Sequence, residues 1–329
     1  MAKRNSYAGG TSHRAFGLAG LRESDIEHIH LSTLEVLERT GVWVEAADAM
    51  DVFADGGCRV DRESHTVKIP PHVVEDAIAS APPRVTLCGS RGPGQDVVLE
   101  PGRVGFTTFC EGIVMHDPWT GERRDTTKKD AGDIGLLADF LDEIDTYQVA
   151  VVSRDVPDAT YELHNLEAGL LNCAKPLGVG PFAEEDQRLT VDIARVVAGG
   201  ADALRERPMI YLTMGPVSPL QLPAGTTASA LHGARAGIPC TALTMAMAGG
   251  SAPATLAGVL VTHNAEVLSV LTLVQLAERG NPFIYGSSTT AFDLRNALAA
   301  VGSPECGMIS AGVAQIARHY RLPSFVAGL

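Results

Sequence analysis

Short apolar runs alternate with helical patterns from about residue 103 onward, and this alternation constrains the fold more than any other feature of the sequence. Such a rhythm is typical of βα units, in which a buried parallel strand is followed by a helix. Seven runs can be counted: Val104–Thr108, Tyr147–Val152, Leu177–Gly180, Met209–Met214, Cys240–Met245, Phe283–Gly286 and Ser324–Ala327. Helical patterns lie between them near residues 127–141, 161–173, 184–198, 225–236, 254–279 and 304–319.

The number of units favours an α/β fold of the (β/α)8 TIM-barrel type over an open doubly wound sheet, because no dinucleotide-binding glycine motif opens the first helix. A closed barrel of this type needs eight strands, and the seventh run lies within two residues of Leu329. We therefore expect an incomplete barrel of about seven strands that lacks its last βα unit. Its unpaired edges suggest a truncated reading of a longer polypeptide.

The part before the barrel divides into two predicted segments. Residues 1–22 are rich in Gly, Ser and Arg and are expected to form a flexible arm, whereas residues 23–102 should form an α+β accessory region. A helix is predicted over 25–40, capped by Ser24 and ended by Gly41. The barrel then occupies residues 103–329.

Charge and cysteine usage exclude several classes of protein. The chain has 26 basic and 39 acidic residues, a net charge of −13, so nucleic acid is not expected as a partner. The six cysteines form no CxxC motif, which favours buried thiols and a cytoplasmic location. The charge-free stretch between Arg235 and Glu266 is interrupted by glycines and Pro253, so it predicts a buried strand, a loop and a buried helix rather than a membrane span.

Residues that follow the strands are the candidates for a binding site, because active sites of such barrels lie at the strand C-termini. An aromatic face beside neutral hydroxyls can hold an alkylammonium ion through cation–π attraction, and a packed tyrosine followed by a turn is the alternative. Two methionines on one side of a strand are core residues or the wall of a pliable pocket. The predicted pocket residues are Tyr285, Ser287, Ser288, Thr289, Met245, Met247, Arg154 and Asp155.

Several other chemistries find little support. No lysine follows Lys175, so an encoded Schiff-base lysine on the later strands is excluded, and an aldolase or lyase on this fold loses its usual nucleophile. His263 and Glu266 share a helix face, yet no third ligand is evident, and we predict no metal. Glu111 and Asp155 are loop carboxylates that suit acid–base work or ordinary ion pairs.

The sequence is similar to the trimethylamine methyltransferase family, and in particular to its pyrrolysine-containing members. The similarity covers essentially the whole chain and is most specific in the order and spacing of several motifs. They are Met245-Ala-Met-Ala-Gly-Gly-Ser251, Val261-Thr-His-Asn-Ala-Glu-Val-Leu-Ser269, Tyr285-Gly-Ser-Ser-Thr-Thr290, Val301-Gly-Ser-Pro-Glu305 and Leu322-Pro-Ser-Phe-Val-Ala-Gly328.

The resemblance implies methyl transfer from trimethylamine to the Co(I) corrinoid of a cognate corrinoid protein. No catalytic residue is then expected within the chain, because the family's pyrrolysine would directly follow Leu329, at an amber codon. We expect no tightly bound cofactor, and we expect a homo-oligomer. Alternatives are a pyrrolysine-independent methyltransferase for quaternary amines such as glycine betaine, and an inactive fragment. Cys110-Glu111 stands where small neutral residues are expected, which indicates a different amine or pocket charge.

Overall fold

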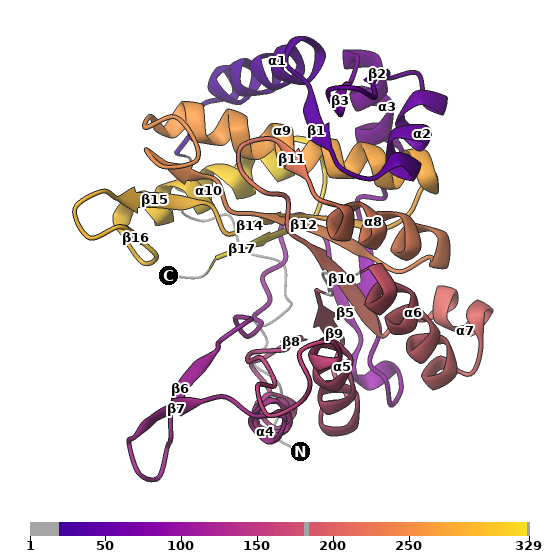
Figure 1. Ribbon diagram of the computed structural model, residues 1–329, viewed down its shortest axis with the longest axis vertical. Coiled ribbons are helices and arrows are strands. Elements are labelled where there is room, and N and C mark those ends of the chain that lie inside the picture. The colour runs from indigo at the N-terminus through magenta and orange to yellow at the C-terminus, as the bar shows by residue number, and fades with distance from the viewer. Residues whose placement is uncertain (1–19, 181–183, 328–329) are drawn as a thin grey trace. The chain divides into compact units, whose positions relative to one another are not determined.

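The computed structural model describes residues 20–180 and 184–327. Helices and parallel strands alternate through most of it, so the predicted α/β class is confirmed (Figure 1). The chain divides into two compact units, which are described one at a time. Residues 86–212 form the first unit, and residues 20–85 together with 213–327 form the second. Residues 1–19, most of the predicted arm, lie outside the described residues.

The first unit contains three parallel strands and the helices that follow them. Tyr147 and Ile210 both pair with Leu177, which places β9 between β8 and β10. The elements are β4 (Val85–Leu87), which begins one residue before the unit, η1 (Pro93–Gln95), β5 (Val97–Leu99), β6 (Val114–His116), β7 (Arg123–Asp125), α4 (Lys128–Phe140), β8 (Tyr147–Gln148), α5 (Tyr161–Asn172), β9 (Leu177–Val179), α6 (Glu184–Ala198), α7 (Ala201–Glu206) and β10 (Ile210–Met214), which ends in the second unit.

The first predicted strand is wrong. Residues 104–108 form no strand, and only Thr107 makes an isolated parallel bridge, to Thr146. The reason is that Val104 and Phe106 are exposed, so this run buries no face against a neighbouring sheet. The segment that follows instead forms the hairpin β6–β7, which the sequence did not predict.

The second unit combines the accessory elements with the later βα units. Tyr285 pairs with Ala242 on one side and with Ser324 on the other, so β14 lies between β12 and β17 in a parallel arrangement. The elements are α1 (Glu23–Arg39), β1 (Val42–Val44), α2 (Ala47–Asp55), β2 (Arg59–Asp61), β3 (Thr66–Lys68), α3 (Pro71–Ser80), β11 (Gln221–Leu222), α8 (Ala224–Ala236), β12 (Cys240–Thr244), β13 (Met247–Ala248), α9 (Leu256–Ala277), β14 (Phe283–Ser287), β15 (Thr290–Asp293), β16 (Leu298–Ala299), α10 (Pro304–His319) and β17 (Ser324–Val326).

Helix α1 confirms the predicted first helix but not its cap. The helix begins at Glu23 after Arg22, whose N–H donates to the Asp25 carboxylate at 2.9 Å, so Ser24 lies inside the helix. Its predicted end is confirmed, because Gly41 has a φ of +81° and donates to Val36. A Cβ on Gly41 would approach the Val67 carbonyl oxygen to 2.4 Å, so glycine is required there for space as well as conformation.

Helix α9 is the core of the second unit. It contacts α1, α3, α8 and α10 as well as the strands β12 and β14, and it is mostly buried over its whole length. By length and hydropathy it could also cross a membrane, yet burial on all sides is what a core helix of a globular protein shows. The uncharged stretch before Glu266 is therefore a buried strand, a loop and the first half of a buried helix, as predicted.

The two compact units do not coincide with the predicted segments 23–102 and 103–329, because the first part of the accessory region packs on α9. Helices α1 and α3 both contact α9, and β1 of the accessory region pairs with β11, which precedes α8. Residues up to 85 therefore cluster with the later βα units, whereas the rest of the predicted accessory region clusters with the earlier ones.

Strands β12 and β14 of the second unit approach each other closely at Gly286. A Cβ at Gly286 would lie 2.5 Å from the Ala242 carbonyl oxygen, and backbone atoms of a paired strand cannot move aside. We expect Gly286→Ala to lower the free energy of unfolding by about 1–3 kcal/mol, measured by urea denaturation. Gly94→Ala is the control, because a Cβ there meets nothing within 4 Å. Equal urea midpoints for the two variants would contradict the explanation.

Candidate functional site

Tyr285, the aromatic residue of the predicted pocket, is packed rather than open. Its side chain is fully buried and its hydroxyl donates to Asn264 Oδ1 of α9 at 2.6 Å. The ring centroid lies 5.4 Å from that of His263 and 6.1 Å from that of Tyr320. These neighbours cover the ring, so the structure has the alternative arrangement, a packed tyrosine, and offers no open aromatic face for a cation.

The hydroxyl residues after Tyr285 divide into a buried pair and an accessible one. Ser287 and Thr289 are buried, and Ser287 Oγ accepts the Thr289 N–H at 3.1 Å. Ser288 donates its N–H to the Thr244 carbonyl at 2.8 Å and keeps part of its surface accessible. Met245 is 40% exposed, and Met247 is half-buried. Three residues of the predicted set in this unit thus remain accessible at the ends of β12 and β14.

Two polar side chains of α9 hold these strand ends from behind. Glu266 is fully buried and accepts hydrogen bonds from Ser218 Oγ at 2.9 Å, from Leu220 N–H at 3.0 Å and from the Thr244 hydroxyl. Burial raises the pKa of Glu266, against the opposing effect of these donors. The Glu266 carboxyl group therefore fixes the loop after β10 against the end of β12. The groups that donate to it hold these segments in place.

His263 is the second buried polar side chain of α9. Its Nδ1 lies 2.9 Å from the Thr289 hydroxyl, and its Nε2 has no hydrogen-bond partner among the described residues. Burial lowers the pKa of His263 to about 3, so the ring is neutral at ordinary pH. In the described part of the chain, no group of three or more His, Cys, Asp or Glu side chains is placed to hold a metal ion.

Arg154 and Asp155 belong to the first unit and are exposed. Asp155 accepts the Lys128 N–H at 2.7 Å, at the start of α4, and the Arg154 guanidinium lies 3.5 Å from an Asp125 carboxylate oxygen. Both residues therefore tie their loop to α4 and to β7. The carboxylate of Asp155 does not join Glu111 in one cavity, because it is not among the lining residues described next.

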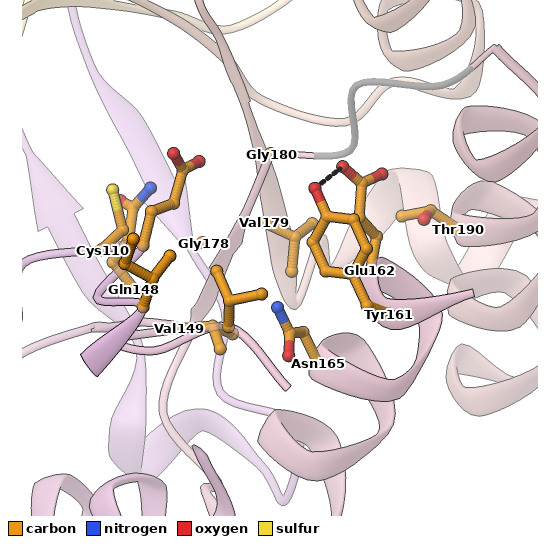
Figure 2. Close-up of a pocket in the computed structure, with 13 residues that line it drawn as sticks. Cys110, Gln148, Val149, Tyr161, Glu162, Asn165, Gly178, Val179, Gly180 and Thr190 are labelled. Atoms are coloured by element: carbon orange, nitrogen blue, oxygen red, sulfur yellow. Dashed lines mark hydrogen bonds between the residues drawn. The ribbon is translucent and has the colours of Figure 1, made fainter. Parts of the chain in front are cut away.

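A cavity of about 300 Å³ lies at the C-terminal ends of β8 and β9, within the first unit (Figure 2). Its lining combines apolar side chains with a thiol, two amides, a tyrosine and two carboxyl groups. The lining residues are Cys110, Glu111, Ile113, Gln148, Val149, Val152, Tyr161, Glu162, Asn165, Gly178, Val179, Gly180 and Thr190. No basic side chain is among these described lining residues, so the cavity is acidic.

One carboxyl group of this cavity contacts Tyr161, and the other lines the same space. The Tyr161 hydroxyl donates to Glu162 Oε1 at 3.0 Å, and the charges of Glu162 and Glu111 help burial to raise the pKa of Tyr161 (Figure 2). The Glu111 side chain is exposed to solvent, yet desolvation by the surrounding protein raises the pKa of its carboxyl group. Its backbone has a φ of +66°, which is uncommon for a residue other than glycine and recurs at functional sites. Cys110 is no nucleophile here, because burial raises the pKa of its thiol to about 11.

Most of this cavity was missed by sequence reasoning. Glu111 was a candidate only as a loop carboxylate, with Asp155 as its companion, whereas the structure places it near Tyr161 and Glu162. One signal was available in the sequence. Tyr161 and Glu162 open the helix that follows a strand, and the first residues of such a helix lie at the same end of the sheet as the strand's C-terminus.

Comparison with known proteins decides the family. A sequence profile described as trimethylamine methyltransferase (MTTB) matches residues 7–329. The chain belongs to the trimethylamine methyltransferase family. It is 45% identical over its whole length to trimethylamine methyltransferase MttB of Desulfitobacterium hafniense and 39% identical to that of Methanosarcina thermophila, and it spans 66% and 69% of those proteins. A glycine betaine methyltransferase of D. hafniense is 30% identical over 94% of this chain, which spans 64% of that protein.

The fold has a solved counterpart. A crystal structure of the hydroxylamine MtmB complex superimposes with a TM-score of 0.50 and 12% sequence identity, over 92% of this chain and 67% of that one. At this identity the likeness concerns the fold alone. Together with the repeated parallel βα units, it confirms the predicted TIM-barrel type, represented here by an incomplete set of strands.

His263, a buried residue of the second unit, gives the stability of the protein a defined pH dependence. Its pKa is about 3 in the folded chain and about 6.5 when unfolded, so only the unfolded state takes up this proton as the pH falls below 6.5. The neutral His263 ring therefore contributes its full stabilisation above pH 6.5. As the pH falls below 6.5 that contribution is lost, and the free energy of unfolding drops by about 1.4 kcal/mol between pH 7.5 and 5.5. We expect His263→Gln to remove that loss in urea denaturation at the two pH values.

His116→Gln is the matched control, because His116 is exposed. It should keep the pH dependence of the parent chain. The same loss of stability in His263→Gln as in the parent would show that His263 is protonated or solvated in the folded state.

Proposed function

We propose that the protein transfers a methyl group from trimethylamine to the Co(I) corrinoid of a separate corrinoid protein. Membership of the trimethylamine methyltransferase family supports the reaction class. The observation that carries the proposal for this chain is the acidic cavity at the C-terminal ends of β8 and β9. A tertiary amine is an ammonium cation at neutral pH, and an acidic, partly apolar cavity matches such a cation in both charge and surface.

The residues of the cavity would bind and orient the amine. Glu111 and Glu162 supply negative charge, and the apolar side chains Val149, Val152 and Val179 supply contacts for methyl groups. A carboxylate in a cavity attracts a cation more strongly than one in bulk water, because protein screens the charge less. Holding the nitrogen at the acidic wall leaves a methyl carbon free to face the open side of the cavity.

Positive charge on nitrogen is what makes the methyl group transferable. The Co(I) corrinoid of the partner would supply the electron pair that accepts the methyl group, and the carbon–nitrogen electron pair would stay on the leaving dimethylamine. The chain's own contribution is to keep the amine in its cationic form and to exclude water around it. The chain spans about two thirds of the length of these relatives.

The charge of the cavity favours trimethylamine over glycine betaine. Glycine betaine carries a carboxylate of its own, and no Lys, Arg or His lines the described cavity to receive it. Glu111 and Glu162 would repel that carboxylate. The more distant similarity to a glycine betaine methyltransferase agrees with this preference.

Several sequence predictions remain as such. They are the pyrrolysine after Leu329, the cytoplasmic location, the homo-oligomer, and a pocket role for Met245, Met247 and Ser288. The gene sequence beyond codon 329 tests the first of them. An amber codon followed by an in-frame continuation is expected, and an ochre codon would contradict it.

Glu111→Gln tests the amine site. Loss of one charge-assisted contact, about 1.5–3 kcal/mol, should raise the KM for trimethylamine about 10- to 100-fold, with a smaller effect on kcat. Because the pKa of Glu111 is raised, the parent's KM should also rise at acidic pH, and that rise should vanish in Glu111→Gln. Glu167→Gln is the control, since Glu167 lies on α5 outside the cavity and pairs with Lys128. Equal KM values for both variants would contradict the assignment.

The activity itself is tested by methyl transfer from trimethylamine to free cob(I)alamin. The protein is produced both as the 329-residue chain and with amber suppression, and the loss of the Co(I) absorption is followed. Transfer that depends on trimethylamine and not on glycine betaine supports the proposal. No transfer from either product would favour the inactive fragment instead.

A further inference from the structure

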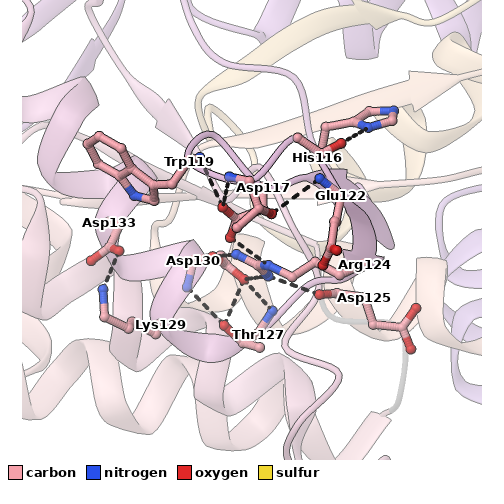
Figure 3. A network of polar contacts seen from close by, with 12 residues as sticks. His116, Asp117, Trp119, Glu122, Arg124, Asp125, Thr127, Lys129, Asp130 and Asp133 are labelled. Atoms are coloured by element: carbon pink, nitrogen blue, oxygen red, sulfur yellow. Dashed lines mark hydrogen bonds and ion pairs between the residues drawn. The ribbon is translucent and has the colours of Figure 1, made fainter.

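The hairpin β6–β7 presents an indole ring to solvent (Figure 3). Trp119 lies in its turn and is 92% exposed, more than any other large hydrophobic residue in the described part of the chain. An indole is normally well buried, because exposing so much apolar surface to water is unfavourable. Tryptophan is also the residue type most enriched among the anchors of protein interfaces.

The turn is held in one conformation before any partner arrives. Asp117 accepts the N–H groups of Trp119 at 2.9 Å and of Thr120 at 3.1 Å. Arg124 on β7 bonds to Asp117 at 3.1 Å and to both carboxylate oxygens of Asp130 at 2.7 and 2.8 Å, which fixes the hairpin to the start of α4 (Figure 3). Because these bonds hold the backbone of the turn, docking through it costs less conformational entropy than docking through an unstructured loop.

The hairpin continues directly from the wall of the acidic cavity. Ile113 lines the cavity and is 55% exposed, and β6 begins at the next residue. A three-residue strand spans about 10 Å. A standard protein interface covers about 800 Å² on each partner, a disc of about 16 Å radius. The radius of such a disc exceeds the length of β6, so a partner seated on Ile113 has the reach to contact the turn of the hairpin.

We propose that the hairpin β6–β7 is a docking element for the corrinoid protein, with the Trp119 indole inserted into an apolar recess of that partner. The inference rests on the proposed function, because that reaction requires a protein-held corrinoid to reach the cavity. Phe109 is a second exposed aromatic residue near the cavity: it is 72% exposed and precedes the lining residue Cys110 in the chain. The indole anchors the complex, and Arg124 acts as a positioning residue for it.

Binding of the cobalamin-loaded corrinoid protein from the same organism tests this surface. We expect Trp119→Ala to raise the Kd at least 10-fold and Trp119→Phe to restore most of the affinity. Phe140→Ala is the matched control, because Phe140 is 80% exposed on α4 of the same unit, and its Kd should equal that of the parent. An unchanged Kd in Trp119→Ala, or no binding by the parent, would overturn the proposal.

Fluorescence locates the indole in the complex. The chain has two tryptophans, so in Trp43→Phe the emission comes from Trp119 alone. We expect both forms of the partner to shift this emission to shorter wavelength, because the indole leaves water. Only the loaded form should also quench it, because the corrinoid absorbs where indole emits. Absence of quenching in a demonstrated complex would place the indole away from the corrinoid and refute the docking geometry.

Kinetics separate this proposal from the proposed function. Trp119→Ala should slow methyl transfer to the corrinoid protein at least 10-fold and leave transfer to free cob(I)alamin unchanged. If the parent transfers to neither acceptor, the proposed function fails, whereas the binding assay still decides the docking surface. If Trp119→Ala instead abolishes self-association and keeps its affinity for the corrinoid protein, the indole belongs to an interface between copies and the proposal is wrong.

Discussion

Burial of α9 on every side is the constraint on which the second unit depends. A helix that is apolar all round cannot face water, so it needs cover beyond the strands on which it lies. Helices α1 and α3 provide that cover, since both pack against α9. The accessory region is thus a structural part of this unit, and the chain order of segments differs from their grouping in space.

The same helix organises the chemistry of its neighbours. Glu266 accepts hydrogen bonds from the loop after β10 and from the end of β12. Asn264 accepts a hydrogen bond from the Tyr285 hydroxyl and donates one to the Tyr320 hydroxyl at 2.8 Å. Buried polar groups of this kind are satisfied by one another, so they specify position more than reactivity. Residues that resemble a binding site in the sequence, Tyr285 above all, are therefore used here to join layers.

The first unit contains two carboxyl groups that line a cavity at the C-terminal ends of its parallel strands. These groups are Glu111 and Glu162, and the described lining residues include no basic side chain. The turn of the hairpin that follows Ile113 is held by hydrogen bonds to Asp117 and carries the exposed indole of Trp119. Glu111 and the hairpin both belong to the segment between residues 103 and 127, and connecting segments of this kind commonly carry binding residues.

The sequence by itself determined the α/β class, the positions of nearly all helices and the family, because these depend on local periodicity and on motifs that stay in order along the chain. It could not decide which side of β14 Tyr285 faces, since a strand buried on both faces carries apolar residues throughout and leaves the direction of each side chain to its pairing partners. Nor could it place Glu111 in one cavity with Tyr161 and Glu162, residues some 50 positions away in the chain. Only the tertiary structure decided that placement, because parallel strands collect distant loops at one edge of a sheet.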